Sequence, residues 1–312
     1  MPSLSTIRAS NAAFRSAYRP TALFVGGTSG CGQGTAQAFA RATQGRAHIL
    51  ICGRNRQAAE RIFESFPKHS ESKYEFVEYD VTLMKNVSKA AEEVKHKISE
   101  ADGQKTTLNY LVLSQGILTM NGFDPTSEGI DKKMALHFYS RWKVGVKFVD
   151  ELLPLLEQAS SDGEEARMMS ILDPGASGEV DTADLGLKKT FTLSKAAEQA
   201  RLYNDNFVAE YSSRHPGISF IHNYPGWVNT DGISKNMPWY LKPVVGPLSR
   251  LGARSLEDCG EYMASGLFNP AYKAGGFYLN QNGEPIAKNK LNVDDLEVRK
   301  RLVEHYTKEV AF

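Results

Sequence analysis

The stretch LFVGGTSGCGQGTAQAFA, residues 23–40, decides the fold. It opens with an apolar run, passes through a glycine-dense segment at 26–34, and continues with small, helix-forming residues at 35–40. This pattern predicts a strand, a tight turn and a helix. A helix start offers unpaired backbone N–H groups and a positive dipole end, which suit a phosphate, and glycines let the backbone approach it closely. The alternative is a glycine-rich connection without a ligand.

Length and charge exclude several classes of function. The chain has 312 residues, of which 41% are hydrophobic, so a single large α/β domain is expected. The formal net charge of +1 gives no electrostatic argument for nucleic acid. No apolar run has the length of a membrane span. Cys31, Cys52 and Cys259 are odd in number and widely spaced. They show no metal-site spacing, and they predict a reducing, cytoplasmic location.

The first nineteen residues permit two interpretations. Arg8, Arg15 and Arg19 lie in a Ser/Ala-rich segment, and no acidic residue precedes Glu60. Organelle transit peptides have this composition. A short helix at 5–14 that packs on the domain is favoured, because the first strand begins directly after Pro20.

Strand and helix patterns alternate along the rest of the chain, which predicts a Rossmann-type, doubly wound parallel sheet in a single domain. The expected domain spans 20–285, with an N-terminal extension at 1–19 and a helical tail at 286–312. A segment rich in Pro, Gly and aromatic residues at 231–252 is predicted to be a substrate flap; a membrane-touching patch is the alternative. The expected strands after the first are 47–52, 74–79, 108–113, 167–172, 217–222 and 276–279, and the expected helices are 57–66, 87–98, 129–156 (stopped or kinked near Pro154), 193–213, 255–268 and 294–310.

The end of the second strand indicates the cofactor. In nicotinamide-binding folds an acid at this position holds the ribose 2′-hydroxyl, whereas an arginine accepts a 2′-phosphate. Gly53 is followed here by Arg54, with Arg56 close by and no acid. The sequence therefore favours NADP(H) over NAD(H). A surface arginine at a helix start is the alternative.

Candidate ligand-binding residues follow the expected strand ends, which meet at one edge of a parallel sheet. This coincidence is much stronger than any single motif. The residues concerned are the turn at 26–32, Arg54, Asp80, the segment 114–116, Asp173 and the segment 225–230.

From about residue 20 to 285 the chain resembles the short-chain dehydrogenase/reductase superfamily. The pattern Gly26-x-x-x-Gly30-x-Gly32 resembles its cofactor turn, Asp80-Val81 its adenine-binding pair, and the segment PGWVNT at 225–230 its nicotinamide-contacting segment. Only the glycine of Ser114-Gln115-Gly116 matches the usual Asn-Ala-Gly. The phrases EGID (128–131) and YSRW (139–142) look similar to fungal members near the retinol-dehydrogenase-like branch. The resemblance implies cofactor contacts from Gly26, Thr28, Ser29, Gly30, Cys31, Gly32, Asp80, Val81, Ser114, Gln115, Gly116, Lys195, Val228 and Thr230.

The family reduces carbonyls with a tyrosine as proton donor, a lysine one helical turn later, an orienting serine after the fifth strand and a supporting asparagine. This sequence departs from that pattern. In the segment FTLSK, Lys195 matches the lysine but Phe191 occupies the tyrosine slot; Asp173 falls at the serine position and His137 near the asparagine. The expected catalytic residues are therefore Lys195, Asp173 and His137, with no metal.

Each replacement leaves an alternative open. Asp173 is an acid or base of raised pKa, or only a turn residue before Pro174. His137 passes protons, or is a core histidine. Tyr203 lies eight residues after Lys195, roughly 12 Å along a helix, too far to substitute by simple exchange.

Three functions follow from these patterns. The first is an NADP(H)-dependent oxidoreductase acting on a carbonyl or hydroxyl of a small apolar molecule, such as a secondary metabolite. The second is a non-redox enzyme of the same fold, namely an isomerase, a dehydratase or a cyclisation catalyst. The third is a cofactor-binding pseudoenzyme. Cofactor motifs support the first two, and the missing tyrosine supports the last two. A homodimer or a homotetramer is left open.

Overall fold

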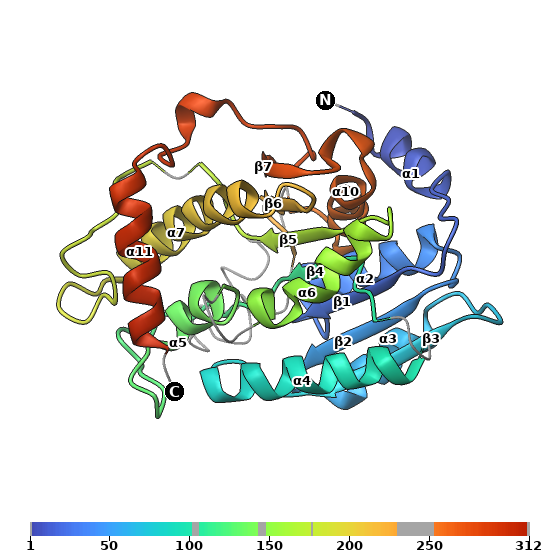
Figure 1. Ribbon diagram of the computed structural model, residues 1–312, viewed down its shortest axis with the longest axis horizontal. Coiled ribbons are helices and arrows are strands. Elements are labelled where there is room, and N and C mark those ends of the chain that lie inside the picture. Colours follow the sequence, from blue (N-terminus) through green and yellow to red (C-terminus); the bar gives the residue numbers. More distant parts are fainter. Residues whose placement is uncertain (1, 102–105, 143–147, 176, 230–252, 311–312) are drawn as a thin grey trace.

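The computed structural model describes residues 2–101, 106–142, 148–175, 177–229 and 253–310. A seven-stranded sheet in the order β3-β2-β1-β4-β5-β6-β7 forms its centre, with helices on both faces (Figure 1). All neighbouring strands run parallel, which confirms the predicted Rossmann-type sheet. The strands are β1 (Thr21–Val25), β2 (His48–Gly53), β3 (Lys73–Glu78), β4 (Tyr110–Leu113), β5 (Arg167–Ile171), β6 (Ser219–Asn223) and β7 (Gly275–Leu279).

Helices lie between the strands as the periodicity predicted. Those on one face of the sheet contribute to a large apolar cluster together with the C-terminal helix, and those on the other face form a second cluster. The first set is α4 (Met84–Ala101), α6 (Phe148–Ser161), α7 (Leu193–Arg214) and α11 (Leu296–Glu309); the second is α2 (Gly30–Ala42), α3 (Arg56–Glu64) and α10 (Leu256–Phe268). None of the helices in the described ranges is both long and apolar enough to cross a membrane.

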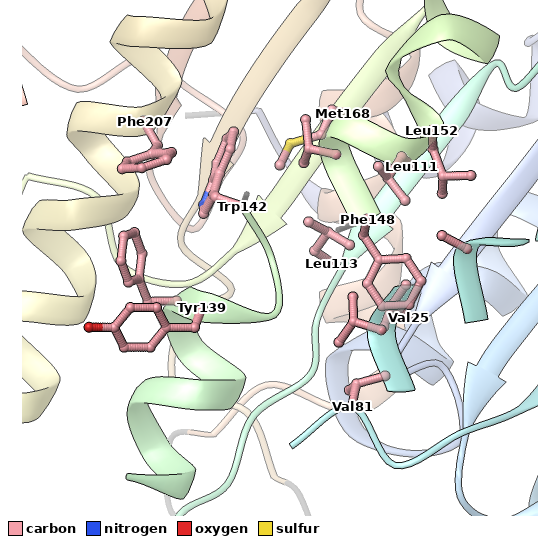
Figure 2. Close-up of a cluster of buried hydrophobic side chains, with 14 of the residues drawn as sticks. Val25, Val81, Leu111, Leu113, Tyr139, Trp142, Phe148, Leu152, Met168 and Phe207 are labelled. Atoms are coloured by element: carbon pink, nitrogen blue, oxygen red, sulfur yellow. The ribbon is translucent and has the colours of Figure 1, made fainter. Parts of the chain in front are cut away.

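The larger cluster shows why these strands fold as central strands. Figure 2 shows strand side chains such as Leu111 and Met168 beside Phe148 and Leu152 of α6, with Trp142 close by. β1, β4, β5 and β6 are buried along their whole length. Strands covered on both faces need continuous apolar runs, which is how these segments read in the sequence.

The single long helix expected at 129–156 is not what the structure shows. Asp131 caps a short α5 (Lys132–Met134), a π-helical turn η1 (Ala135–Tyr139) follows, and a separate α6 begins at Phe148. Pro154 neither stops α6 nor marks its end, since the helix continues to Ser161. Buried leucines on both sides of Pro154 anchor α6 against the core, which offsets the hydrogen bond that proline removes.

The N-terminal segment is a packed helix, the favoured one of its two interpretations. α1 (Leu4–Ala12) lies beside α10 (Figure 1). Asn11 Nδ2 donates to Glu261 Oε2 at 2.7 Å and to its backbone oxygen at 2.9 Å. The rings of Phe14 and Phe268 stack with centroids 4.1 Å apart. α1 therefore helps to hold α10, which in turn packs on α2.

Candidate active site at the carboxyl edge of the sheet

The glycine turn lies between β1 and α2, where the strand order reverses. Gly26 has φ +80°, and a Cβ on it would lie 2.6 Å from the backbone nitrogen of Gln115. A Cβ on Gly32 would overlap Ser114 Oγ, which donates to Val25 O at 2.8 Å. The turn and the end of β4 are thus in backbone contact. Ser29 precedes α2 without capping it through its side chain, so the first N–H groups of the helix face the turn.

A cavity of about 430 Å³ opens beside this turn at the end of β2. Arg54 contributes to its wall and is 67% exposed, with Nη1 3.8 Å from Asp80 Oδ2. A second arginine, Arg61 on α3, also lines the cavity, and sequence reasoning missed it. Helical spacing was the signal available in the sequence, because Arg61 lies three residues after Ala58 and therefore on the same face of α3. Arg56 turns away to Glu78, at 3.0 Å. The lining is Thr28, Ser29, Gln33, Gln37, Arg54, Asn55, Ala58, Arg61 and Ile62.

The ends of β3 and β4 place two further predicted groups near this edge. Asp80 Oδ1 accepts from the backbone nitrogen of Thr82 at 3.0 Å and from its hydroxyl at 2.8 Å. Val81 is buried. After β4, Gln115 is buried and its Nε2 donates to Ser140 Oγ at 3.2 Å. Asp80 is therefore held in a fixed turn, and Gln115 is tied to the segment after η1.

His137 lies against the same loop. Its Nε2 accepts a hydrogen bond from the backbone nitrogen of Ile117 at 3.1 Å, so the ring proton belongs on Nδ1. Burial, together with the charges of Arg141 and Lys133, lowers the pKa of His137 to about 3. The imidazole is neutral at physiological pH. In this geometry its Nε2 holds the loop after Gly116 through the backbone nitrogen of Ile117.

Arg141 joins the two strand ends that border the site, and sequence reasoning gave it no role. Its guanidinium is fully buried and donates to Leu113 O at 3.2 Å, Gln115 O at 2.8 Å and Ile171 O at 2.9 Å. It also donates to Ser170 Oγ at 2.8 Å. Burial lowers the pKa of Arg141 to about 9. A charged residue within an apolar helical pattern was the available signal.

Asp173 follows β5 and faces α7. Its Oδ2 lies 2.6 Å from Arg201 Nη1, and the two side chains are 38% and 31% exposed. One helical turn further along α7, buried Asp205 accepts from the backbone nitrogen of Gly175 at 2.9 Å and pairs with His222 Nδ1 of β6 at 2.7 Å. α7 therefore presents a polar row to the ends of β5 and β6. Neither Arg201 nor Asp205 was singled out from the sequence.

Lys195 lies elsewhere. Its Nζ is 2.5 Å from Asp181 Oδ2 and 2.7 Å from Thr190 Oγ1, both in the loop before α7. Phe191 precedes the helix, because Thr192 is its N-cap, and packs against Phe123 at 5.5 Å between ring centroids. Phe191 and Lys195 therefore do not lie one turn apart on the same helix, as the family pattern implies they should. The structure brings Arg201, not Lys195, to Asp173.

The remaining predicted residues lie after β6. Val228 is buried and forms a β-bridge with Arg254. Thr230 and the predicted flap at 231–252 lie outside the described residues. Within the described ranges, His, Cys, Asp and Glu side chains form no group that could hold a metal ion.

Exposed apolar side chains follow β4 and β6 at the same edge. Leu118 is 59% exposed, Met120 70% and Phe123 42%, all on the loop after β4. Trp227, after β6, is 52% exposed. Large apolar side chains gathered beside a site are typical of surfaces that meet apolar ligands.

A glycine turn at the reversal point of a doubly wound parallel sheet defines the class of dinucleotide-binding Rossmann folds. Comparison with known proteins is more specific. Residues 20–161 match the family described as short chain dehydrogenase. The oxidoreductase AN1596 of Emericella nidulans is 35% identical over 270 residues, which cover 82% of this chain and 76% of that protein. The chain belongs to the short-chain dehydrogenase/reductase superfamily, as its motifs predicted.

Other relatives and structures agree with this assignment. The oxidoreductase andH of Emericella variicolor is 32% identical, covering 84% of this chain and 74% of that protein. The resemblance to fungal members is thus confirmed, whereas the retinol-dehydrogenase-like placement stays a prediction. The NADPH-bound carbonyl reductase from chicken fatty liver superimposes with a TM-score of 0.60 at 20% identity, covering 86% of this chain and 99% of that one. The RhlG/NADP complex of Pseudomonas aeruginosa gives 0.58 at 21% identity, covering 86% and 96%. Both structures share the fold of this chain.

Proposed function

We propose that this chain is a cytoplasmic, NADP(H)-dependent oxidoreductase that acts on a carbonyl or hydroxyl of a small apolar, secondary-metabolite type of substrate. The observation that carries the proposal is the cavity beside the glycine turn, which Arg54 and Arg61 both line. Two guanidiniums suit the ribose 2′-phosphate, which distinguishes NADP(H) from NAD(H), and the described residues that line the cavity include no carboxylate.

The glycine turn fits the cofactor's pyrophosphate. Side chains at Gly26 or Gly32 would collide with the end of β4, so the backbone itself forms the cradle. The start of α2 faces this cradle with N–H groups and its positive dipole end. NADPH bound there supplies a hydride at its nicotinamide ring. The chain's own contribution is to bind the phosphates, orient the nicotinamide across the ends of β4 and β5, and handle the proton.

The polar row of α7 supports chemistry at a carbonyl. Arg201, held by Asp173 at the end of β5, is a fixed positive charge close to where an alkoxide would form. The apolar side chains Leu118, Met120 and Trp227 at the same edge favour an apolar substrate. Fungal relatives named oxidoreductases and a neighbour named carbonyl reductase support the same class of reaction.

Cofactor titration tests the proposal. We expect NADPH to bind more tightly than NADH by calorimetry, and both Arg54→Ala and Arg61→Ala to weaken NADPH roughly 5- to 30-fold while leaving NADH unchanged, because each removes one exposed charge-assisted contact. Arg56→Ala is the matched control, since Arg56 pairs with Glu78 outside the cavity. Equal affinities for NADPH and NADH in the wild type would contradict the proposed cofactor.

A second candidate is non-redox chemistry or cofactor binding without turnover. It is favoured by one observation: neither Phe191 nor Ala197, which lies one turn before Arg201 on α7, carries a phenol. Incubating the enzyme and NADPH with a panel of apolar ketones and aldehydes separates the two. One alcohol formed per NADPH oxidised supports the oxidoreductase; product without NADPH oxidation supports an isomerase, dehydratase or cyclisation catalyst.

A further inference from the structure

A carbonyl reductase must deliver a proton to the developing alkoxide, and the usual helical slot provides none in this chain. We propose that Tyr224, the residue directly after β6, is the proton-donating catalytic residue, with Arg201 as the positioning residue beside it. This inference rests on the proposed oxidoreductase function.

The other described phenols are excluded by position or by their hydrogen bonds. Those of the helices and of β7 are bonded within the fold: Tyr203 donates to Leu185 O, Tyr211 to Asp150, Tyr278 to Asp205 O and Tyr139 pairs with His305. Only two described tyrosines directly follow strands. Tyr79 follows β3 at the far edge of the sheet, whereas Tyr224 follows β6, next to β5. Among the described residues, the Tyr224 hydroxyl has no hydrogen-bond partner, and its side chain is half-buried.

Register places Tyr224 opposite Arg201. Side chains on β6 alternate, and Phe220 and His222 face α7, where His222 pairs with Asp205. Tyr224 is still within the sheet ladder, since its backbone nitrogen donates to Leu279 O at 2.9 Å, so it faces the same side. Two residues along a strand advance about 6.6 Å. One turn back along α7, from Asp205 to Arg201, covers about 6 Å. Tyr224 and Arg201 therefore face each other beside the pair formed by His222 and Asp205.

The neighbouring strand brings the third group. Ile171 pairs with Asn223, and the backbone nitrogen of Leu172 donates to Asn223 O at 3.1 Å, so the ends of β5 and β6 are adjacent. Asp173, two residues beyond β5, binds Arg201. The phenol thus sits near an ion pair at the open edge, where the ends of β4, β5 and β6 surround the space for a nicotinamide and a substrate.

Electrostatics keep Tyr224 protonated. Partial burial raises the pKa of its hydroxyl, the carboxylate of Asp173 raises it further, and the guanidinium of Arg201 lowers it. A general acid must hold its proton until the alkoxide forms, and a nearby cation then stabilises the phenolate that remains. The buried Asp205–His222 pair lies next to Tyr224 and Arg201 on the same two elements, β6 and α7.

The proposed step balances. The carbonyl carbon receives a hydride, with both electrons, from NADPH, which leaves as NADP⁺. The π electrons move onto the carbonyl oxygen, which takes the proton from Tyr224 Oη and becomes the alcohol. The O–H bond of the phenol breaks, and water returns a proton to the phenolate through its exposed side.

Turnover provides the first test. With any ketone that the wild type reduces, Tyr224→Phe is expected to lower kcat/KM about 10²- to 10⁴-fold, without changing the NADPH Kd measured by calorimetry. Tyr272→Phe is the matched control; its hydroxyl donates to Gly283 O, away from the site, and its rate should stay unchanged. If the wild type is active and Tyr224→Phe is equally active, the role of Tyr224 is refuted but the proposed function is not. A wild type that reduces no carbonyl would refute the proposed function itself, and with it this role.

A second readout needs no turnover. Tyrosine labelled with an NMR-active ring carbon reports the ionisation of Tyr224, assigned by its loss in Tyr224→Phe. Asp173→Asn should lower the pH midpoint of this resonance, and Arg201→Gln should raise it, because the two neighbours act with opposite sign. If neither substitution changes the pH midpoint, Tyr224 does not lie beside Asp173 and Arg201, whatever the kinetics show.

Discussion

Replacing Gly26 by alanine should destabilise the cofactor turn in two ways, through backbone strain and through a clash of the new Cβ. Gly26 has φ +80°, in the left-handed region, so any Cβ there is strained by about 1–2 kcal/mol. That Cβ would also lie 2.6 Å from the backbone nitrogen of Gln115 and 2.8 Å from its Cα. Both are backbone atoms at the end of β4, which is paired to β1, so they cannot rotate away. Overpacking of this kind costs a further ~1–3 kcal/mol.

Gly129 provides the matched control. It has nearly the same backbone angle, φ +78°, but a Cβ on it would meet no atom within 4 Å. Gly129→Ala should therefore lower the free energy of unfolding by the backbone strain alone, about 1–2 kcal/mol, and Gly26→Ala by roughly 2–5 kcal/mol. Urea unfolding followed by circular dichroism measures both. Gly26→Ala should also weaken NADPH binding, whereas Gly129→Ala should not. Equal losses for the two variants would refute the close approach of the turn to β4.

Three further predictions concern other parts of the chain. Burial lowers the pKa of His48 to about 4 and that of His137 to about 3, so below pH 6.5 the unfolded chain binds more protons than the folded one. The free energy of unfolding should therefore be highest above pH 6.5 and should fall by about 1 kcal/mol per histidine near pH 5.5. In urea titrations, His48→Gln should reduce this loss by about half. Lys195→Ala and Phe191→Tyr should change NADPH affinity and turnover by no more than about two-fold, because Lys195 binds Asp181 and Thr190, and Phe191 packs against Phe123. A large loss on Lys195→Ala would restore the motif-based assignment. Arg141→Leu leaves several buried carbonyls without their donor, and should lower the free energy of unfolding by about 3 kcal/mol or more by chemical denaturation.

Local patterns in the sequence were sufficient for the fold. Alternating apolar runs and helical periodicity located the strands and helices of the sheet, because parallel strands buried on both faces leave a strong signal. Residues that follow a strand were placed correctly at one edge, since parallel strands end there together. Arg54, Asp80 and Asp173 are examples. The prediction of one helix at 129–156 was wrong because the periodicity shows neither the helix cap at Asp131 nor the buried leucines that hold α6 together across Pro154.

The sequence by itself determined a doubly wound sheet, a phosphate-suited turn and the set of strand-end residues that meet beside it, because each depends on a few neighbouring positions. Only the tertiary structure decided which residues of α7 face that edge. Motif spacing pointed to Lys195, but Thr192 caps the helix and the pairing of Asp205 with His222 fixes its rotation, which brings Arg201 to Asp173. Helix rotation and strand register arise from contacts between residues far apart in the chain, and no local pattern encodes them.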